Sequence, residues 1–157
     1  MASTVKNLPL RTTPAEQISL LVVSPEEQDL TAVRSVFHHH TWKVQRGSSL
    51  GEARASLTAS SVVLCERELP DGSWKDVLGE LERIGSPAAL VVISGQADEL
   101  LWAEVLNMGG YDVLPKPLDK TEVTRVVGMA WRHAEGLRRK TAATYRPALE
   151  QVVAPAV

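Results

Sequence analysis

The chain has 157 residues, a formal net charge of −2 and a single cysteine, Cys65. This length predicts one domain, and the charge argues against a dedicated nucleic-acid binder, which usually carries a strong basic excess. One cysteine excludes an intramolecular disulfide and a Cys-based zinc site. Together with the absence of an apolar N-terminal segment, it favours a cytoplasmic protein without a membrane span.

Strand and helix patterns alternate along most of the chain. Residues 1–16 are polar and aperiodic, so they are expected to form a disordered arm. Between residues 17 and 135, helical spacing follows each of five short apolar or β-branched runs. These expected strands are Ile18–Val23, Thr41–Arg46, Val62–Cys65, Ala88–Ile93 and Tyr111–Leu114. Residues 136–157 show little periodicity and are expected to be a tail, partly helical or disordered.

Capping patterns mark the start of three of the expected helices. Ser24 is expected at the N-cap of the first helix, with Pro25 at its first helical position. The other two patterns are Ser49–Glu52 and Asp119–Glu122. Each predicts a helix that begins one residue after the capping side chain.

The alternation predicts a parallel sheet with helices on both faces. In such sheets, ligands and chemistry lie at the carboxyl ends of the strands. No Gly-rich phosphate loop follows the first strand, which argues against nucleotide binding.

Three segments at these strand ends resemble the receiver domain of response regulators. They are Val62–Gly72 with its Leu-Pro-Asp-Gly turn, Pro87–Asp98, and Gly109–Pro117 with its Lys-Pro turn. They follow one another in the order and at the spacing of that family, over about residues 17–135. The resemblance implies an α/β, flavodoxin-like fold: a doubly wound parallel five-stranded sheet of strand order 2-1-3-4-5 with five helices.

The resemblance also implies the roles of particular positions. In an active receiver, two acidic residues after the first strand hold Mg²⁺, and an aspartate after the third accepts a phosphoryl group from a histidine kinase. Glu66 stands at that acceptor position, and Ser94 and Lys116 match the hydroxyl and the lysine that contact the phosphoryl group. The acidic pair falls on Ser24 and Pro25.

Two further positions follow from the same alignment. Val113 replaces the aromatic residue that often reports the switch, and the Lys116–Pro117 peptide bond is expected to be cis. Since Mg²⁺ is usually held by carboxylates, the loss of the acidic pair predicts that Mg²⁺ binding is lost or weak, and no other metal or cofactor is expected. Glu66 is expected to form an ion pair with Lys116.

The chain is therefore interpreted as a single-domain, degenerate receiver, not an enzyme, that signals through protein–protein contact and without phosphorylation. Two alternatives remain open. One is an atypical receiver that is still phosphorylated, with Glu26 or Glu27 as metal ligand. The other is a flavodoxin-like domain that binds a small ligand at the same strand ends.

Two tryptophans suggest where a partner docks. Trp102 and Trp131 fall outside the apolar stripes of the fourth and fifth helices and are expected to be exposed. In the receiver family, the face made by the fourth helix, fifth strand and fifth helix commonly mediates dimerisation or partner docking. A homodimer through this face, or a complex with a kinase or effector, is expected; a membrane or nucleic acid is not.

Overall fold

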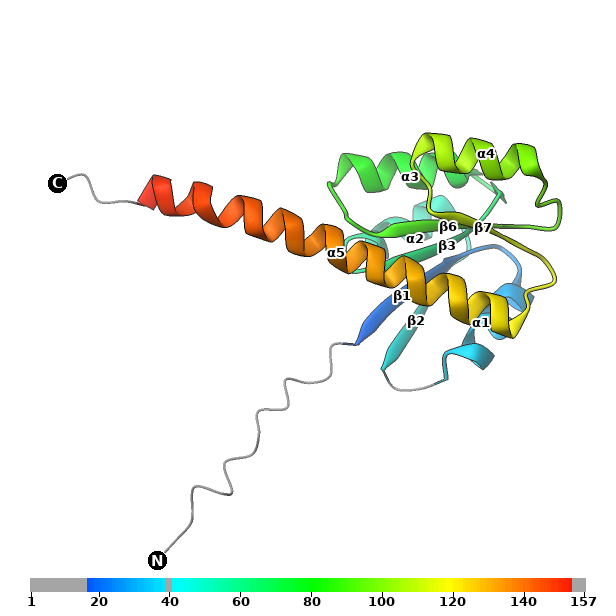
Figure 1. The fold of residues 1–157 in the computed structure, drawn as a ribbon. Helices are drawn as coiled ribbons and strands as arrows, with labels where there is room; N and C mark the ends of the chain where they lie inside the picture. The colour runs from blue at the N-terminus through cyan, green and yellow to red at the C-terminus, as the bar shows by residue number, and fades with distance from the viewer. Residues whose placement is uncertain (1–16, 39–40, 154–157) are drawn as a thin grey trace, which may run out of the picture.

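The computed structural model describes residues 17–38 and 41–153 (Figure 1). The predicted arm, residues 1–16, lies outside the described residues. The parallel sheet has the order β2-β1-β3-β6-β7, which is the predicted order 2-1-3-4-5 because β6 and β7 are its fourth and fifth strands in the chain. The strands of this sheet are β1 (Ile18–Val23), β2 (Trp42–Gly47), β3 (Val62–Glu66), β6 (Ala89–Ser94) and β7 (Asp112–Pro115).

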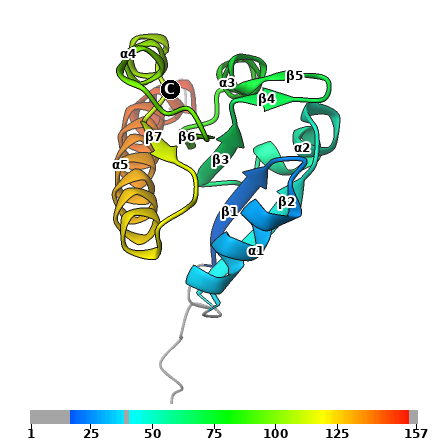
Figure 2. The ribbon, with the colours of Figure 1, turned by 90° about the vertical axis from the view of Figure 1, so that its right-hand side faces the viewer.

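Five helices cover the two faces of the sheet. They are α1 (Glu27–Val36), α2 (Leu50–Leu57), α3 (Trp74–Arg83), α4 (Glu99–Met108) and α5 (Lys120–Val153). Figures 1 and 2 show α3 and α4 on one side of the sheet and α1 and α5 on the other. A small antiparallel hairpin, β4 (Glu68–Leu69) with β5 (Gly72–Ser73), leads from β3 into α3.

The alternation of side chains along the strands divides the core into two layers. Leu21 and Val23 of β1 pack with α2, α3 and α4, whereas Leu20 and Val22 pack with α1 and α5. All four side chains are fully buried. Apolar runs such as Ile18–Val23 therefore reflect a sheet that is covered on both faces.

The start of α1 differs from the prediction. The helix begins at Glu27, and Glu26 before it has extended backbone, so Ser24 is not its N-cap and Pro25 is not a helical residue. The Ser24 hydroxyl accepts the Glu26 N–H at 3.1 Å and donates to Asp29 Oδ2 at 2.7 Å. The prediction was wrong because this hydroxyl bridges a loop N–H and a buried carboxylate instead of closing the first turn.

The other two capping predictions are confirmed. Ser49 Oγ accepts the N–H of Glu52 at 3.2 Å, and Asp119 Oδ2 accepts the N–H of Glu122 at 3.0 Å. These contacts span three residues, the separation of an N-cap from the third helical position.

The last helix continues far beyond the sheet. α5 has 34 residues and ends at Val153, so much of the segment expected as a tail is helical. In Figure 1 its C-terminal part, drawn in orange and red, projects away from the rest of the domain. Within the described part of the chain, no helix is long and apolar enough to cross a bilayer.

Candidate functional site

The candidate site lies at the carboxyl edge of the sheet, where four strands end side by side. Glu66 is the last residue of β3, Ser94 the last of β6, and Lys116 follows β7. The Lys116 N–H donates to the Ser94 carbonyl at 2.9 Å, which fixes the two strand ends against each other. The Lys116–Pro117 peptide bond is cis, the isomer predicted from the sequence.

The ammonium group of Lys116 lies among three carboxylates. It contacts Glu26 Oε2 at 3.1 Å and Asp29 Oδ2 at 3.2 Å, and it forms a close ion pair with Glu66 Oε2. The Lys116 side chain is only 15% exposed. The pairing of Lys116 with Glu66 was expected, but the sequence interpretation placed neither Glu26 nor Asp29 beside this lysine.

Asp29 is the residue that sequence reasoning missed altogether. Its side chain is buried, and its Oδ2 atom takes part in both the hydrogen bond from Ser24 and the ion pair with Lys116. One signal was available: Asp29 lies four residues before Val33, on the helix face that packs inward. An acidic residue on the inward face of a helix needs a polar partner, and Lys116 supplies it.

The charges in this cluster do not balance. Burial alone would lower the pKa of Lys116, but contacts with Glu66, Glu26 and Asp29 together raise it above its usual range. Burial raises the pKa of Glu66, and the neighbouring Lys116 offsets this only in part. One ammonium is thus the shared counter-ion of three carboxylates, so removing it would leave only acidic groups there.

The residues at this edge do not fit Mg²⁺ as the resemblance would place it. The Ser24 hydroxyl is engaged by Glu26 N–H and Asp29, Pro25 offers no side-chain ligand, and the Lys116 ammonium lies at the point where Asp29 and Glu66 converge. No three His, Cys, Asp or Glu side chains in the described ranges are grouped so that they could hold a metal ion.

Glu27, the other candidate metal ligand, points to a different partner. Its carboxylate lies 3.7 Å from Arg46 on β2, and the glutamate side chain is largely exposed. Arg46 also donates to the Pro25 carbonyl at 3.1 Å. Both contacts hold the β1–α1 loop against the edge strand rather than against the Lys116 cluster.

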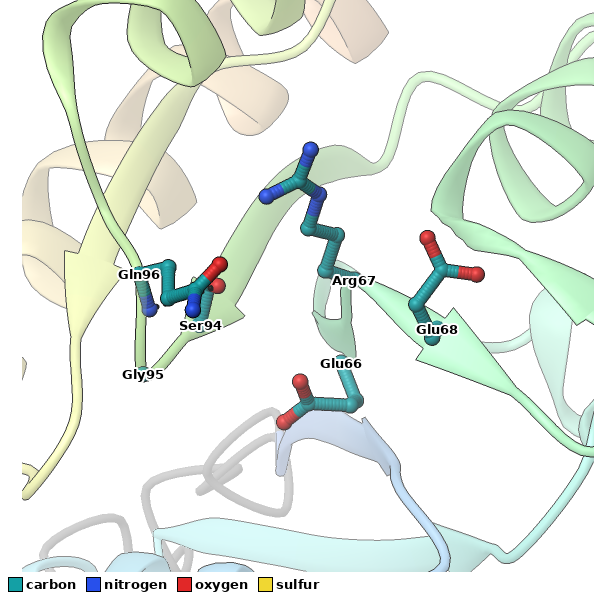
Figure 3. Close-up of a pocket in the computed structure, with 6 residues that line it drawn as sticks. All are labelled: Glu66, Arg67, Glu68, Ser94, Gly95 and Gln96. Carbon is teal, nitrogen blue, oxygen red and sulfur yellow. Dashed lines mark hydrogen bonds between the residues drawn. The ribbon is translucent and has the colours of Figure 1, made fainter.

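A hollow opens beside Ser94. It has a volume of about 420 Å³ and is lined by Glu66, Arg67, Glu68, Ser94, Gly95 and Gln96. Figure 3 shows Glu66 and Arg67 extending in opposite directions from consecutive residues of the chain, with Ser94 across the opening. The buried Ser94 hydroxyl accepts the Gln96 N–H at 3.1 Å. The retained hydroxyl thus faces a polar, open hollow.

Val113, at the position of the switch aromatic, is part of the core. Its side chain is buried and packs in the layer that contains Leu101 and Val105 of α4. No aromatic side chain stands at this position that could turn between two orientations.

The two tryptophans do not form one surface. Trp102 is 50% exposed on α4, as expected. Trp131 is partly buried, and its ring packs edge-on against Trp42 with centroids 6.4 Å apart. The expectation of an exposed Trp131 was wrong because the edge strand β2 offers it an aromatic partner on the α1 side of the sheet.

α4 carries four of the exposed large apolar side chains of the described residues, and α5 carries Met129 and Leu137. Those of α4 are Leu100, Trp102, Leu106 and Met108. On the flank towards α3, Glu104 forms an ion pair with Lys75, which ties α4 to its neighbour. Trp102 and Leu106, four residues apart, share one side of α4, whereas Leu100 and Met108 lie on the other side of the buried Leu101 and Val105. We call the pair Trp102 and Leu106 the α4 surface.

Comparisons with known proteins identify the fold. No protein-family model and no curated protein sequence matches the chain. Among solved structures, the signal receiver domain of a protein described as a Luxo repressor from Vibrio parahaemolyticus has a TM-score of 0.70 and 15% identity. The match covers 89% of this chain and 99% of that one.

Other solved structures agree with this match. The signal receiver domain of an HD domain-containing protein from Pseudomonas fluorescens has a TM-score of 0.68 and 20% identity, over 76% of this chain and 98% of that one. The CheX–CheY–BeF3–Mg²⁺ complex from Borrelia burgdorferi matches with a TM-score of 0.64 and 18% identity, over 70% of this chain and 86% of that one. The chain therefore has the fold of a response-regulator receiver domain, with the flavodoxin-like five-stranded parallel sheet.

Proposed function

We propose that this protein is a degenerate receiver that takes part in two-component signalling through protein–protein contact and without phosphorylation. The observation that carries the proposal is the position of the Lys116 ammonium among Glu26, Asp29 and Glu66. The resemblance implies that in an active receiver this lysine contacts a phosphoryl group. Here the lysine contacts the Glu66 carboxylate of the chain itself.

The geometry of Glu66 supports a site that needs no phosphodonor. Its side chain is one methylene longer than that of aspartate, and its carboxylate reaches Lys116 directly. Charge-assisted contacts of this kind are stronger than neutral ones, so the pair favours one arrangement of the β3 and β7 ends. Asp29, held by Ser24, reinforces that arrangement from α1.

The α4 surface is the proposed docking site for a signalling partner. Exposed aromatic and apolar side chains that share one side of a helix, as Trp102 and Leu106 do, are typical of protein interfaces. Trp102 is the proposed anchor, because half-exposed tryptophans are enriched among residues that dominate binding energy. Trp131 is not part of the proposed docking site, because its ring packs on Trp42.

Phosphotransfer can be tested directly. The wild type would be incubated with acetyl phosphate and Mg²⁺ and then examined by intact-mass spectrometry and amide NMR spectra. We expect no phosphoryl adduct and no shift of the signals near Lys116. The positive control is the triple variant Ser24→Asp, Pro25→Asp, Glu66→Asp, which restores the acidic residues of the family.

One outcome would overturn the proposal. A Mg²⁺-dependent adduct on the wild type that disappears in Glu66→Gln would show an atypical but active receiver. Docking is tested separately with a genomically adjacent kinase or effector: Trp102→Ala should weaken the complex, whereas Trp131→Ala should act only through stability.

A further inference from the structure

Charge is distributed unevenly between α5 and the rest of the domain. The sequence of α5 carries seven Lys and Arg against three Glu, a net charge of +4. Residues 17–38 and 41–119, which we call the acidic body, carry eight Lys and Arg against 15 Asp and Glu, a net charge of −7. The small net charge of the whole chain therefore conceals a basic helix attached to an acidic body.

Three arginines of α5 lie in one row on its outer side. Arg125, Arg132 and Arg139 are seven residues apart, so they point in nearly the same direction and span about 21 Å along the helix axis. All three are exposed. The opposite side of α5 carries the side chains that are buried against the sheet, which are Val123, Val126, Val127, Ala130 and Ala134. The row therefore faces away from the sheet, on a side of α5 that no helix or strand covers in Figure 2.

The guanidinium groups of this row are mostly without a partner in the chain. Arg125 donates to Glu122, three residues earlier, at 2.8 Å. Arg132 and Arg139 form no ion pair with any residue that the structure describes. Each guanidinium has five N–H donors and a permanent positive charge, so the row offers charge and hydrogen bonds to a ligand with regularly spaced anionic groups.

Small residues separate the arginines on the same side of the helix. At spacings of three and four residues, the positions that alternate with the arginines are Thr121, Gly128, Gly136 and Ala143. A Cβ atom added at Gly128 or Gly136 would meet no atom within 4 Å, so no contact inside the domain requires either glycine. Glycine also weakens a helix relative to alanine. Between the arginines, α5 thus leaves room for another backbone to approach closely.

We propose that the outer row of α5 binds an acidic helix of a partner protein. On a helix that lies along α5, side chains seven residues apart point to the same side, so it can offer one carboxylate to each of Arg125, Arg132 and Arg139. Guanidinium and carboxylate groups pair through two parallel hydrogen bonds, which fixes the register of the two helices. The small residues between the arginines then let the two backbones lie close together.

The acidic body favours a narrow partner over a broad anionic surface. A nucleic-acid duplex or a bilayer extends well beyond the row, so its phosphates would also approach a region with a net charge of −7. Helices that lie on membranes insert an apolar face, and as far as Ala134 the apolar face of α5 is buried in the domain. A single acidic helix can contact the row without reaching the acidic body.

Binding of two synthetic peptides to the full chain tests the proposal. Both are Ala-rich, are held helical by a covalent staple and contain three Glu; the spacing is seven residues in one and five in the other, which spreads the carboxylates around the helix. Fluorescence anisotropy of the labelled peptides at low ionic strength measures their affinity. We expect the seven-residue spacing to bind at least about tenfold more tightly. This binding should weaken as salt is added, because exposed ion pairs are screened.

Substitutions in and beside the row locate the contact. Arg132→Gln and Arg139→Gln should each weaken binding of the peptide with seven-residue spacing by at least about threefold. The control Lys140→Gln removes the same charge from an exposed neighbour on another side of α5, and should change the affinity by less than about twofold. Gly136→Leu fills the space between two arginines and should also weaken binding, although leucine is the better helix former. Circular dichroism of each variant checks that the helix is retained.

Several results would contradict an acidic helical partner. Equal affinity for the two peptides, equal effects of Arg139→Gln and Lys140→Gln, or no binding of either peptide at low ionic strength would each overturn the proposal. Binding to phosphatidylserine vesicles or duplex DNA that depends on Arg132 and Arg139, without peptide binding, would assign the row to a phosphate surface instead. None of these outcomes bears on Lys116 or on the α4 surface.

Discussion

Two serine turns at the carboxyl edge of the sheet have the same local geometry and different surroundings. Ser24 directly follows β1, and Ser94 is the last residue of β6. Both residues are buried, and each hydroxyl accepts a hydrogen bond at 3.1 Å from the N–H of the residue two positions later in the chain. Ser24 also donates to the buried carboxylate of Asp29. In the described part of the chain, the Ser94 hydroxyl has no such acceptor and lies beside an open hollow.

The difference arises from the acidic residue in the segment that follows each serine. α1 begins three residues after Ser24 and returns Asp29 to the strand end, where it meets Lys116. After Ser94, Asp98 caps α4 by accepting the Leu101 N–H at 2.9 Å, so its carboxylate is used at the helix start. One turn is therefore part of a charge cluster, and the other leaves its hydroxyl available at the surface of the site.

The largest expected effect comes from removing the cation of the cluster. Lys116→Met would leave Asp29, Glu66 and Glu26 without a counter-ion, which for a mostly buried ion pair costs about 3 kcal/mol of unfolding free energy. Urea denaturation at neutral pH would measure this. The exposed Lys120→Met is the control; a loss below about 1 kcal/mol in Lys116→Met would mean that the cluster contributes little to stability.

The same cluster predicts a pH dependence on the alkaline side. Its contacts raise the pKa of Lys116 in the folded state, so the folded protein keeps a proton that the unfolded chain releases. Unfolding free energy should therefore fall as the pH rises above the ordinary lysine pKa of about 10.4. Denaturation midpoints across this range would show the fall in the wild type, and a comparable slope in Lys116→Met would assign it to other groups.

The paired substitutions Ser24→Ala and Ser94→Ala test the comparison most directly. Ser24→Ala removes a donor from the buried Asp29 carboxylate and should cost about 1.5 kcal/mol. Ser94→Ala removes the acceptor of the Gln96 N–H, a part-buried hydrogen bond, and should cost about 0.5 kcal/mol. Equal losses in urea denaturation would show that the two turns are equivalent and that the link to Asp29 is unimportant.

The cap of α4 tests why Ser94 has no acidic partner. Asp98→Ala removes the acceptor of the Leu101 N–H and should lower the free energy of unfolding by about 1 kcal/mol. Asp98→Asn keeps an acceptor oxygen and should restore most of the loss. If thermal unfolding shows no change for Asp98→Ala, then this carboxylate is not committed to the cap, and the account of why Ser94 has no acidic partner fails.

Sequence patterns determined the elements and much of the edge of the sheet. The apolar runs located the five strands of the main sheet, and two capping patterns, at Ser49 and Asp119, placed helix starts because an N-cap contact spans only three residues. The resemblance placed Glu66 and Lys116 at strand ends on the same edge of the sheet, where they do form an ion pair. These features depend on local spacing or on the order of strands, both of which the sequence displays.

Only the tertiary structure decided which polar groups meet. Asp29 and Lys116 are 87 residues apart, and nothing in the local pattern of either says that they share a contact. The same holds for Trp131, which an aromatic partner on β2 covers, and for Ser24, whose hydroxyl serves Asp29 instead of a helix end. A buried polar or aromatic side chain takes the partner that packing brings within reach, and that choice is fixed by the whole fold, not by neighbours in the chain.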